Sequence, residues 1–131
     1  MSKILIIEDE RAILVLLNRI VTHMGHSAVT TTNGTEALEE LEASDPQLVV
    51  SDLKMPGTPS GLDLIRELHK RKPAVPILVI SGYASSELMS RWPDLGINQF
   101  VPKPFRMDTI RDAIIRALNG TESPAVNAAT S

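Results

Sequence analysis

The chain has 131 residues, of which 43% are hydrophobic and 22% are charged, and its formal net charge is −3 at pH 7. This length suits one domain with its own hydrophobic core and excludes two domains of ordinary size. The acidic balance argues against nucleic acid as a direct partner. Because the sequence has no cysteine, no secretory leader and no apolar run of membrane-spanning length, we expect a cytoplasmic protein without disulfides or membrane contact.

Strand and helix patterns alternate from the start of the chain. A continuous apolar run predicts a buried strand over residues 3–7, and apolar side chains at i, i+3, i+4 spacing predict a helix over residues 10–24. Residues 27–31 form a less apolar strand pattern, which indicates the edge of a sheet. A second helix is predicted over residues 35–43, before Asp45-Pro46 interrupts the pattern.

The third strand pattern begins at Leu48 and runs directly into Asp52, where a Pro-Gly turn follows. The next helix is predicted over residues 61–72. Its apolar stripe comprises Leu62, Ile65 and Leu68. His69 lies off this stripe, so we expect it to face water together with the basic residues around it.

The remaining predicted elements are a strand over residues 77–80, a short helix that begins near Ser85-Ser86 and is limited by Pro93, a strand over residues 99–101 and a helix over residues 107–118. Residues 121–131 are small and polar without periodicity, so we expect a disordered tail after a domain of residues 1–120. Five mostly apolar strands alternating with five helices predict an α/β fold with a parallel sheet covered on both faces. Right-handed crossovers favour the flavodoxin-like, doubly wound order 2-1-3-4-5.

Polar side chains follow four of the predicted strands at the point where each strand ends. These side chains are Glu8 and Asp9, Asp52, Ser81, and Lys103. In the order 2-1-3-4-5 the first and third strands are neighbours, so the three acids converge at the carboxyl edge of the sheet. Ligands bind at that edge in open α/β sheets. The order of strands therefore predicts one site that contains three carboxylates, a hydroxyl and an ammonium group.

This set of groups suits phosphoryl transfer. Three crowded carboxylates repel one another, and a hard divalent cation such as Mg²⁺ relieves that repulsion and neutralises an incoming phosphoryl group. Lys103 and Ser81 supply a point charge and a hydroxyl donor for the phosphoryl oxygens. An aspartate nucleophile can form an acyl phosphate. The residues thus predict phosphoryl transfer onto Asp52.

The chain resembles a response-regulator receiver domain of two-component signalling over residues 3–118. The motifs that carry the resemblance are Glu8-Asp9, Asp52-Leu53-Lys54-Met55-Pro56-Gly57, Ser81-Gly82 and Phe100-Val101-Pro102-Lys103-Pro104-Phe105. The resemblance implies that Asp52 accepts the phosphoryl group and that Asp9 is a direct Mg²⁺ ligand. It further implies that Glu8 acts on the metal largely through water and that the backbone carbonyl of Lys54 is a further ligand.

The resemblance also assigns roles at the ends of the last two strands. Ser81 looks like the switch hydroxyl that follows the phosphate, and Phe100 looks like the aromatic residue that turns inward with it. Lys103 resembles the lysine of the family's site, and the Lys103-Pro104 bond is expected to be cis. Two departures from the family pattern are a longer loop over residues 57–60 and the Trp92-Pro93 step in the fourth helix.

The function that the resemblance implies is a signalling switch rather than an enzyme. A histidine kinase or phosphotransfer protein would supply the phosphoryl group. The surface formed by the fourth helix, fifth strand and fifth helix would then bind a downstream effector or a second copy of the chain. Direct nucleic-acid binding and membrane binding are not expected.

Other classes of protein remain open from the residues alone. Asp52 could be the transient nucleophile of a phosphatase or other hydrolase, although Lys54 stands where a second catalytic acid would be expected. A nucleotide-binding domain is disfavoured because Glu8 and Asp9 occupy the first strand-to-helix turn, where they would repel a phosphate. A pseudo-receiver that only docks a partner is disfavoured because all five site residues are present.

Overall fold

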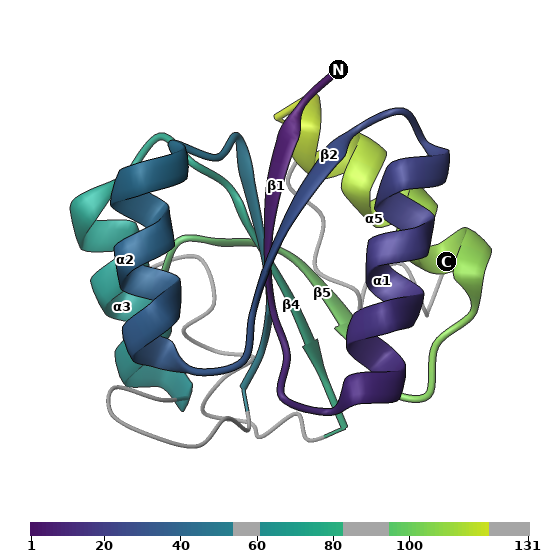
Figure 1. Cartoon of the computed structure of the whole chain (residues 1–131), viewed down its shortest axis with the longest axis horizontal. Coiled ribbons are helices and arrows are strands. Elements are labelled where there is room, and N and C mark those ends of the chain that lie inside the picture. Colours follow the sequence, from purple (N-terminus) through teal and green to yellow (C-terminus); the bar gives the residue numbers. More distant parts are fainter. Residues whose placement is uncertain (54–60, 83–94, 121–131) are drawn as a thin grey trace.

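The computed structural model describes residues 1–53, 61–82 and 95–120, which form a five-stranded parallel sheet with helices on both faces (Figure 1). The elements are β1 (Lys3–Ile7), α1 (Arg11–His23), β2 (Ser27–Thr31), α2 (Gly34–Ser44), β3 (Leu48–Asp52), α3 (Gly61–Arg71), β4 (Ile77–Ser81), β5 (Ile97–Pro102) and α5 (Met107–Leu118). The predicted fourth helix with Trp92-Pro93, the loop over residues 57–60 and the predicted tail lie outside the described residues, so those predictions and the domain boundary at residue 120 stay predictions.

The strand order is β2-β1-β3-β4-β5, which confirms the predicted flavodoxin-like, doubly wound α/β fold. β2 lies at one edge, as its less apolar sequence predicted. Every residue of β3 and β4 is buried, because parallel strands in the middle of a sheet are covered on both faces. Along β3, Ser51 pairs with Ile7 of β1, and Asp52 pairs with Ile80 of β4.

Helices α2 and α3 cover one face of the sheet, and α1 and α5 cover the other (Figure 1). Side chains alternate between the two faces along each strand, so the core divides into two apolar clusters. On β3, for example, Val49 packs on the α2/α3 face and Val50 on the α1/α5 face. In the part of the chain described above, no helix has the length and apolar character needed to cross a membrane.

Helix α3 corrects two predictions. Leu64 is fully buried with Ile65 and Leu68, whereas Leu62 is only partly buried against the same cluster. The prediction that His69 faces water was wrong, because its ring lies against Gly96. A Cβ atom built on Gly96 would clash with that ring, and Gly96 has a φ of +80°, so only glycine suits this turn. The Nδ1 atom of His69 is buried without a hydrogen-bond partner among the residues described.

Strand β5 begins two residues earlier than predicted and contains an irregularity near its start. Ile97 pairs with Ile77 of β4 and Gln99 pairs with Leu78, so Asn98 is an extra residue in the ladder. An extra residue of this kind reverses the faces of the side chains that follow it. As a result Phe100 packs in the α2/α3 cluster and Val101 in the α1/α5 cluster.

Candidate functional site

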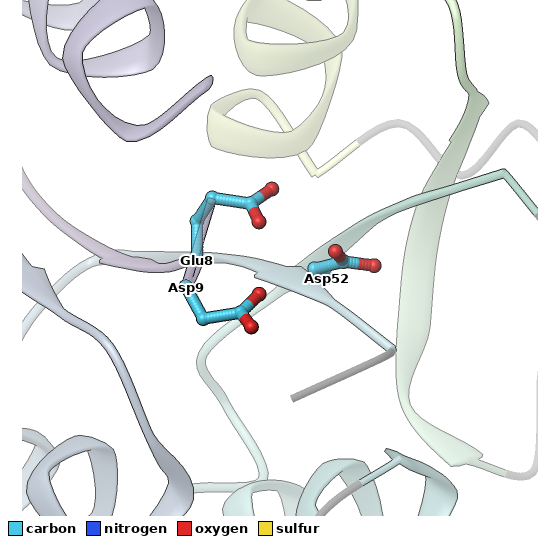
Figure 2. A group of neighbouring side chains, drawn as sticks. All are labelled: Glu8, Asp9 and Asp52. Atoms are coloured by element: carbon cyan, nitrogen blue, oxygen red, sulfur yellow. The ribbon is translucent and has the colours of Figure 1, made fainter. Parts of the chain in front are cut away.

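Three carboxylates meet at the carboxyl edge of the sheet, where β1 and β3 end side by side (Figure 2). Glu8 and Asp9 follow β1, and Asp52 is the last residue of β3. Each acid offers one carboxylate oxygen, and these oxygens all lie within 4.8 Å of one another. Glu8 and Asp52 are buried, with exposed fractions of 1% and 8%, whereas Asp9 is exposed. The predicted convergence of the acids is therefore present.

Lys103 reaches the acids from the segment after β5. Its Nζ atom lies 2.9 Å from Oδ2 of Asp52 and 3.1 Å from Oε1 of Glu8. The Lys103 backbone N–H donates to the carbonyl oxygen of Ser81 at 2.9 Å, which ties the ends of β4 and β5 together. Ser81 itself is buried, with an exposed fraction of 1%. The Lys103-Pro104 bond is cis, as expected.

The electrostatics of the site follow from burial opposed by pairing. Burial raises the pKa of Glu8, and the charge of Asp52 raises it further. The Glu10 backbone N–H, which donates to Oε2 of Glu8 at 3.1 Å, and the Lys103 ammonium lower that pKa but do not cancel the effect of burial. Burial lowers the pKa of Lys103, but its hydrogen bonds to Asp52 and Glu8 outweigh burial, so the pKa is raised overall.

The donor set fits a hard divalent cation, because its carboxylate oxygens are the ligands that Mg²⁺ prefers. Such an acidic cluster is typical of the Mg²⁺ site of receiver domains. Asp9 offers a carboxylate that is accessible to a cation. It is exposed, and within the ranges that the structure describes no hydrogen bond or ion pair engages its carboxylate. Glu8, in contrast, is already held by Lys103 and by the Glu10 backbone.

The structure brings together five of the residues that the sequence singled out: Glu8, Asp9, Asp52, Ser81 and Lys103. Lys54, the predicted backbone ligand, lies outside the described residues. Phe100 is buried in the α2/α3 cluster, with an exposed fraction of 4%. Glu10, whose backbone N–H holds Glu8, was not among the predicted site residues. Its position two residues after Glu8, at the start of α1, was the signal that could have found it.

Comparison with known proteins identifies the family. The response regulator receiver domain model matches residues 4–115, so the chain belongs to this family, which serves two-component signal transduction. Sporulation initiation phosphotransferase F of Bacillus subtilis is 29% identical over 117 residues, which are 89% of this chain and 94% of that protein. The DNA-binding transcriptional regulator NtrC of Klebsiella pneumoniae is 29% identical over 114 residues, which are 87% of this chain and 24% of the regulator.

A solved structure supports the same assignment. The CheY-like response regulator receiver domain protein of Methanospirillum hungatei aligns with a TM-score of 0.85 and 26% identity, covering 92% of this chain and 95% of that chain. The chain thus spans nearly all of some relatives and about a quarter of others. Receiver domains are typically signalling switches rather than classical enzymes. Glu8, Asp9 and Asp52 form the acidic pocket of this receiver domain.

The raised pKa of Glu8 predicts a pH-dependent effect on stability. A carboxyl group with a raised pKa in the folded state stabilises the fold below its ordinary pKa of 4.5, and this contribution is lost as the pH rises through the folded-state value. Glu8→Gln is neutral throughout and avoids the loss. With chelator present, we expect Glu8→Gln to gain thermal stability over wild type at pH 7, and to lose that advantage below pH 4.5, as measured by calorimetry.

Glu39→Gln is the matched control, because it removes one negative charge from an exposed position on α2. If Glu8→Gln were less stable than wild type at pH 7, the ion pair with Lys103 would outweigh the cost of burying Glu8, contrary to the direction of its pKa.

Proposed function

We propose that this chain is a phosphorylatable receiver of a two-component phosphorelay and that Asp52 is its acceptor. The phosphoryl group would come from the phosphohistidine of a histidine kinase or phosphotransfer protein in a Mg²⁺-dependent reaction. One observation carries this proposal. The Asp52 carboxylate is held 2.9 Å from the Lys103 ammonium and within 4.8 Å of the Glu8 and Asp9 carboxylates, at the edge where ligands of such sheets bind.

The chemical step follows from these groups. A carboxylate oxygen of Asp52 forms a bond to phosphorus while the phosphorus–nitrogen bond of phosphohistidine breaks, and the electron pair leaves with the imidazole nitrogen. Lys103 stabilises charge on the phosphoryl oxygens, and the hydroxyl of Ser81 donates to one of them. A bound Mg²⁺ supplies charge neutralisation for the incoming phosphoryl group. Slow hydrolysis of the acyl phosphate then resets the switch.

The ligands proposed for Mg²⁺ are the carboxylates of Asp9 and Asp52 and the backbone carbonyl of Lys54, with Glu8 acting through water. Among the described residues no group engages the carboxylate of Asp9, which supports its direct role, since it can bind a cation without giving up a bond to any of them. The bonds of Glu8 to Lys103 and to the Glu10 backbone support its indirect role.

Phosphorylation is proposed to act through Ser81 and Phe100 on the surface of the fourth helix, β5 and α5. A phosphoryl group adds up to about two negative charges beside Ser81 and Lys103. Because Lys103 is bonded to the Ser81 backbone, a shift of Ser81 would be felt along β5, on which Phe100 packs inward. Phosphorylation shifts the equilibrium between the two conformations of this surface only by the difference in their affinity for the phosphoryl group.

A groove of about 440 Å³ beside β5 and α5 supports this surface as the one that binds a downstream effector or a second copy of the chain. Its lining combines apolar Pro104 and Phe105 with charged Arg106, Asp112 and Arg116. Apolar and charged side chains gathered in one groove suit a protein partner. The absence of a nucleic-acid or membrane partner and a cytoplasmic location stay predictions.

The acceptor is tested by incubating the protein with Mg²⁺ and acetyl phosphate and measuring its mass. We expect wild type to gain one hydroxylamine-labile phosphoryl group and Asp52→Asn to gain none, because the amide is not a nucleophile of comparable strength. Asp63→Asn, at an exposed position on α3, should be labelled like wild type. Labelling of Asp52→Asn to the wild-type extent would refute the assignment. Continuous release of phosphate from many substrates would instead favour the hydrolase alternative.

The metal ligands are tested by calorimetric titration with Mg²⁺. We expect Asp9→Ala to weaken binding roughly tenfold or more and to slow phosphorylation, because it removes a direct ligand. Glu8→Ala should weaken binding less, because Glu8 acts through water. Equal Mg²⁺ affinity of wild type and Asp9→Ala would mean that Asp9 only complements the amino terminus of α1.

A further inference from the structure

Ser51 is the one polar side chain in β3 before Asp52, and it has no place in the chemistry proposed above. It is completely buried, and it lies in the middle of the sheet, paired with Ile7 of β1 and Val79 of β4. Its side chain lies on the α2/α3 face with Val49, since side chains alternate along a strand. An apolar residue would bury there at lower cost, because a hydroxyl group must find a hydrogen bond to offset its desolvation.

The hydroxyl of Ser51 makes that hydrogen bond to the next residue. Its Oγ donates to the backbone carbonyl oxygen of Asp52 at 2.8 Å. This carbonyl belongs to the peptide that leads out of β3, so the bond limits rotation of that peptide about the Asp52 Cα atom. A bond from a buried donor persists because no water competes for either group.

The orientation of the Asp52 peptide matters to the site because the Asp52 carboxylate branches from the same Cα atom. That carboxylate must keep one oxygen 2.9 Å from Lys103 while it remains beside Glu8 and Asp9. A small displacement of a reacting group from the geometry required for reaction slows the reaction even when the substrate still binds. The bond from Ser51 thus holds the backbone from which the Asp52 carboxylate branches, next to the edge of the sheet where the acids meet.

We propose that Ser51 is a positioning residue for phosphoryl transfer onto Asp52, acting through the Asp52 backbone carbonyl. This inference rests on the proposed function. It predicts that loss of the hydroxyl lowers the rate of transfer at saturating phosphodonor and leaves the half-saturating donor concentration unchanged. Ser51 touches neither the donor nor the metal, so its effect should appear in the transfer step alone.

The test compares Ser51→Thr with Ser51→Val, because threonine and valine have nearly the same shape and only threonine has the hydroxyl. We expect Ser51→Thr to be phosphorylated by acetyl phosphate at close to the wild-type rate. Ser51→Val should be about fivefold to tenfold slower at saturating donor, which corresponds to the loss of one hydrogen bond. The ¹³C shift of the Asp52 carbonyl, measured by NMR without donor, should move in Ser51→Val and stay in place in Ser51→Thr.

Equal transfer rates for the two variants would overturn the role of Ser51 while labelling of wild type on Asp52 left the proposed function intact. A wild type that takes up no phosphoryl group would instead refute the proposed function, and the role of Ser51 with it. If the added methyl group unfolds both variants, Ser51→Ala is compared with wild type. An unchanged rate in Ser51→Ala overturns the proposal, and a fivefold to tenfold lower rate with an unchanged half-saturating concentration supports it.

Discussion

The site depends on one arrangement, in which the Lys103 ammonium lies between the carboxylates of Glu8 and Asp52. Burying any one of these charges alone would cost several kcal/mol, and loss of Lys103 would leave the two buried acids without a compensating charge. The two buried acids cannot both be tolerated at this edge without a cation. Lys103 serves that need in the structure described here, and the same excess of negative charge is what suits the pocket to a divalent cation.

The parallel sheet is what allows residues distant in sequence to form this arrangement. β1 and β3 are neighbours, so the acids that follow them meet, and β4 separates β3 from β5. The backbone bond between Lys103 and Ser81 then holds the end of β5 against the end of β4. Because the polar groups of the site stand at strand ends, they are collected on one edge of the sheet.

Much of the fold and site could be predicted because both follow from short patterns. Apolar runs predict the strands. The residue that follows each run, such as Asp52, predicts which side chains stand at the carboxyl edge of the sheet. The contact of the His69 ring with Gly96 could not be predicted, because the spacing along α3 does not show that β5 begins beside its last turn. The extra residue at Asn98, which sets the face on which Phe100 lies, could not be predicted either, because so short a strand does not show a change of periodicity. The bond of Ser51 to Asp52 belongs to the same group, since a serine in a strand gives no sign of which carbonyl it will contact.

In this site Lys103 is held as a cation by two buried carboxylates. The most direct measurement is the pKa of Lys103, obtained by NMR titration of its ¹³Cε resonance in metal-free protein. We expect a pKa above the ordinary value of 10.5, and a lower pKa in Asp52→Asn, where one of the two hydrogen-bonded charges is lost. A pKa at or below 10.5 in wild type would contradict this arrangement, because burial would then outweigh the pairing on which the site depends.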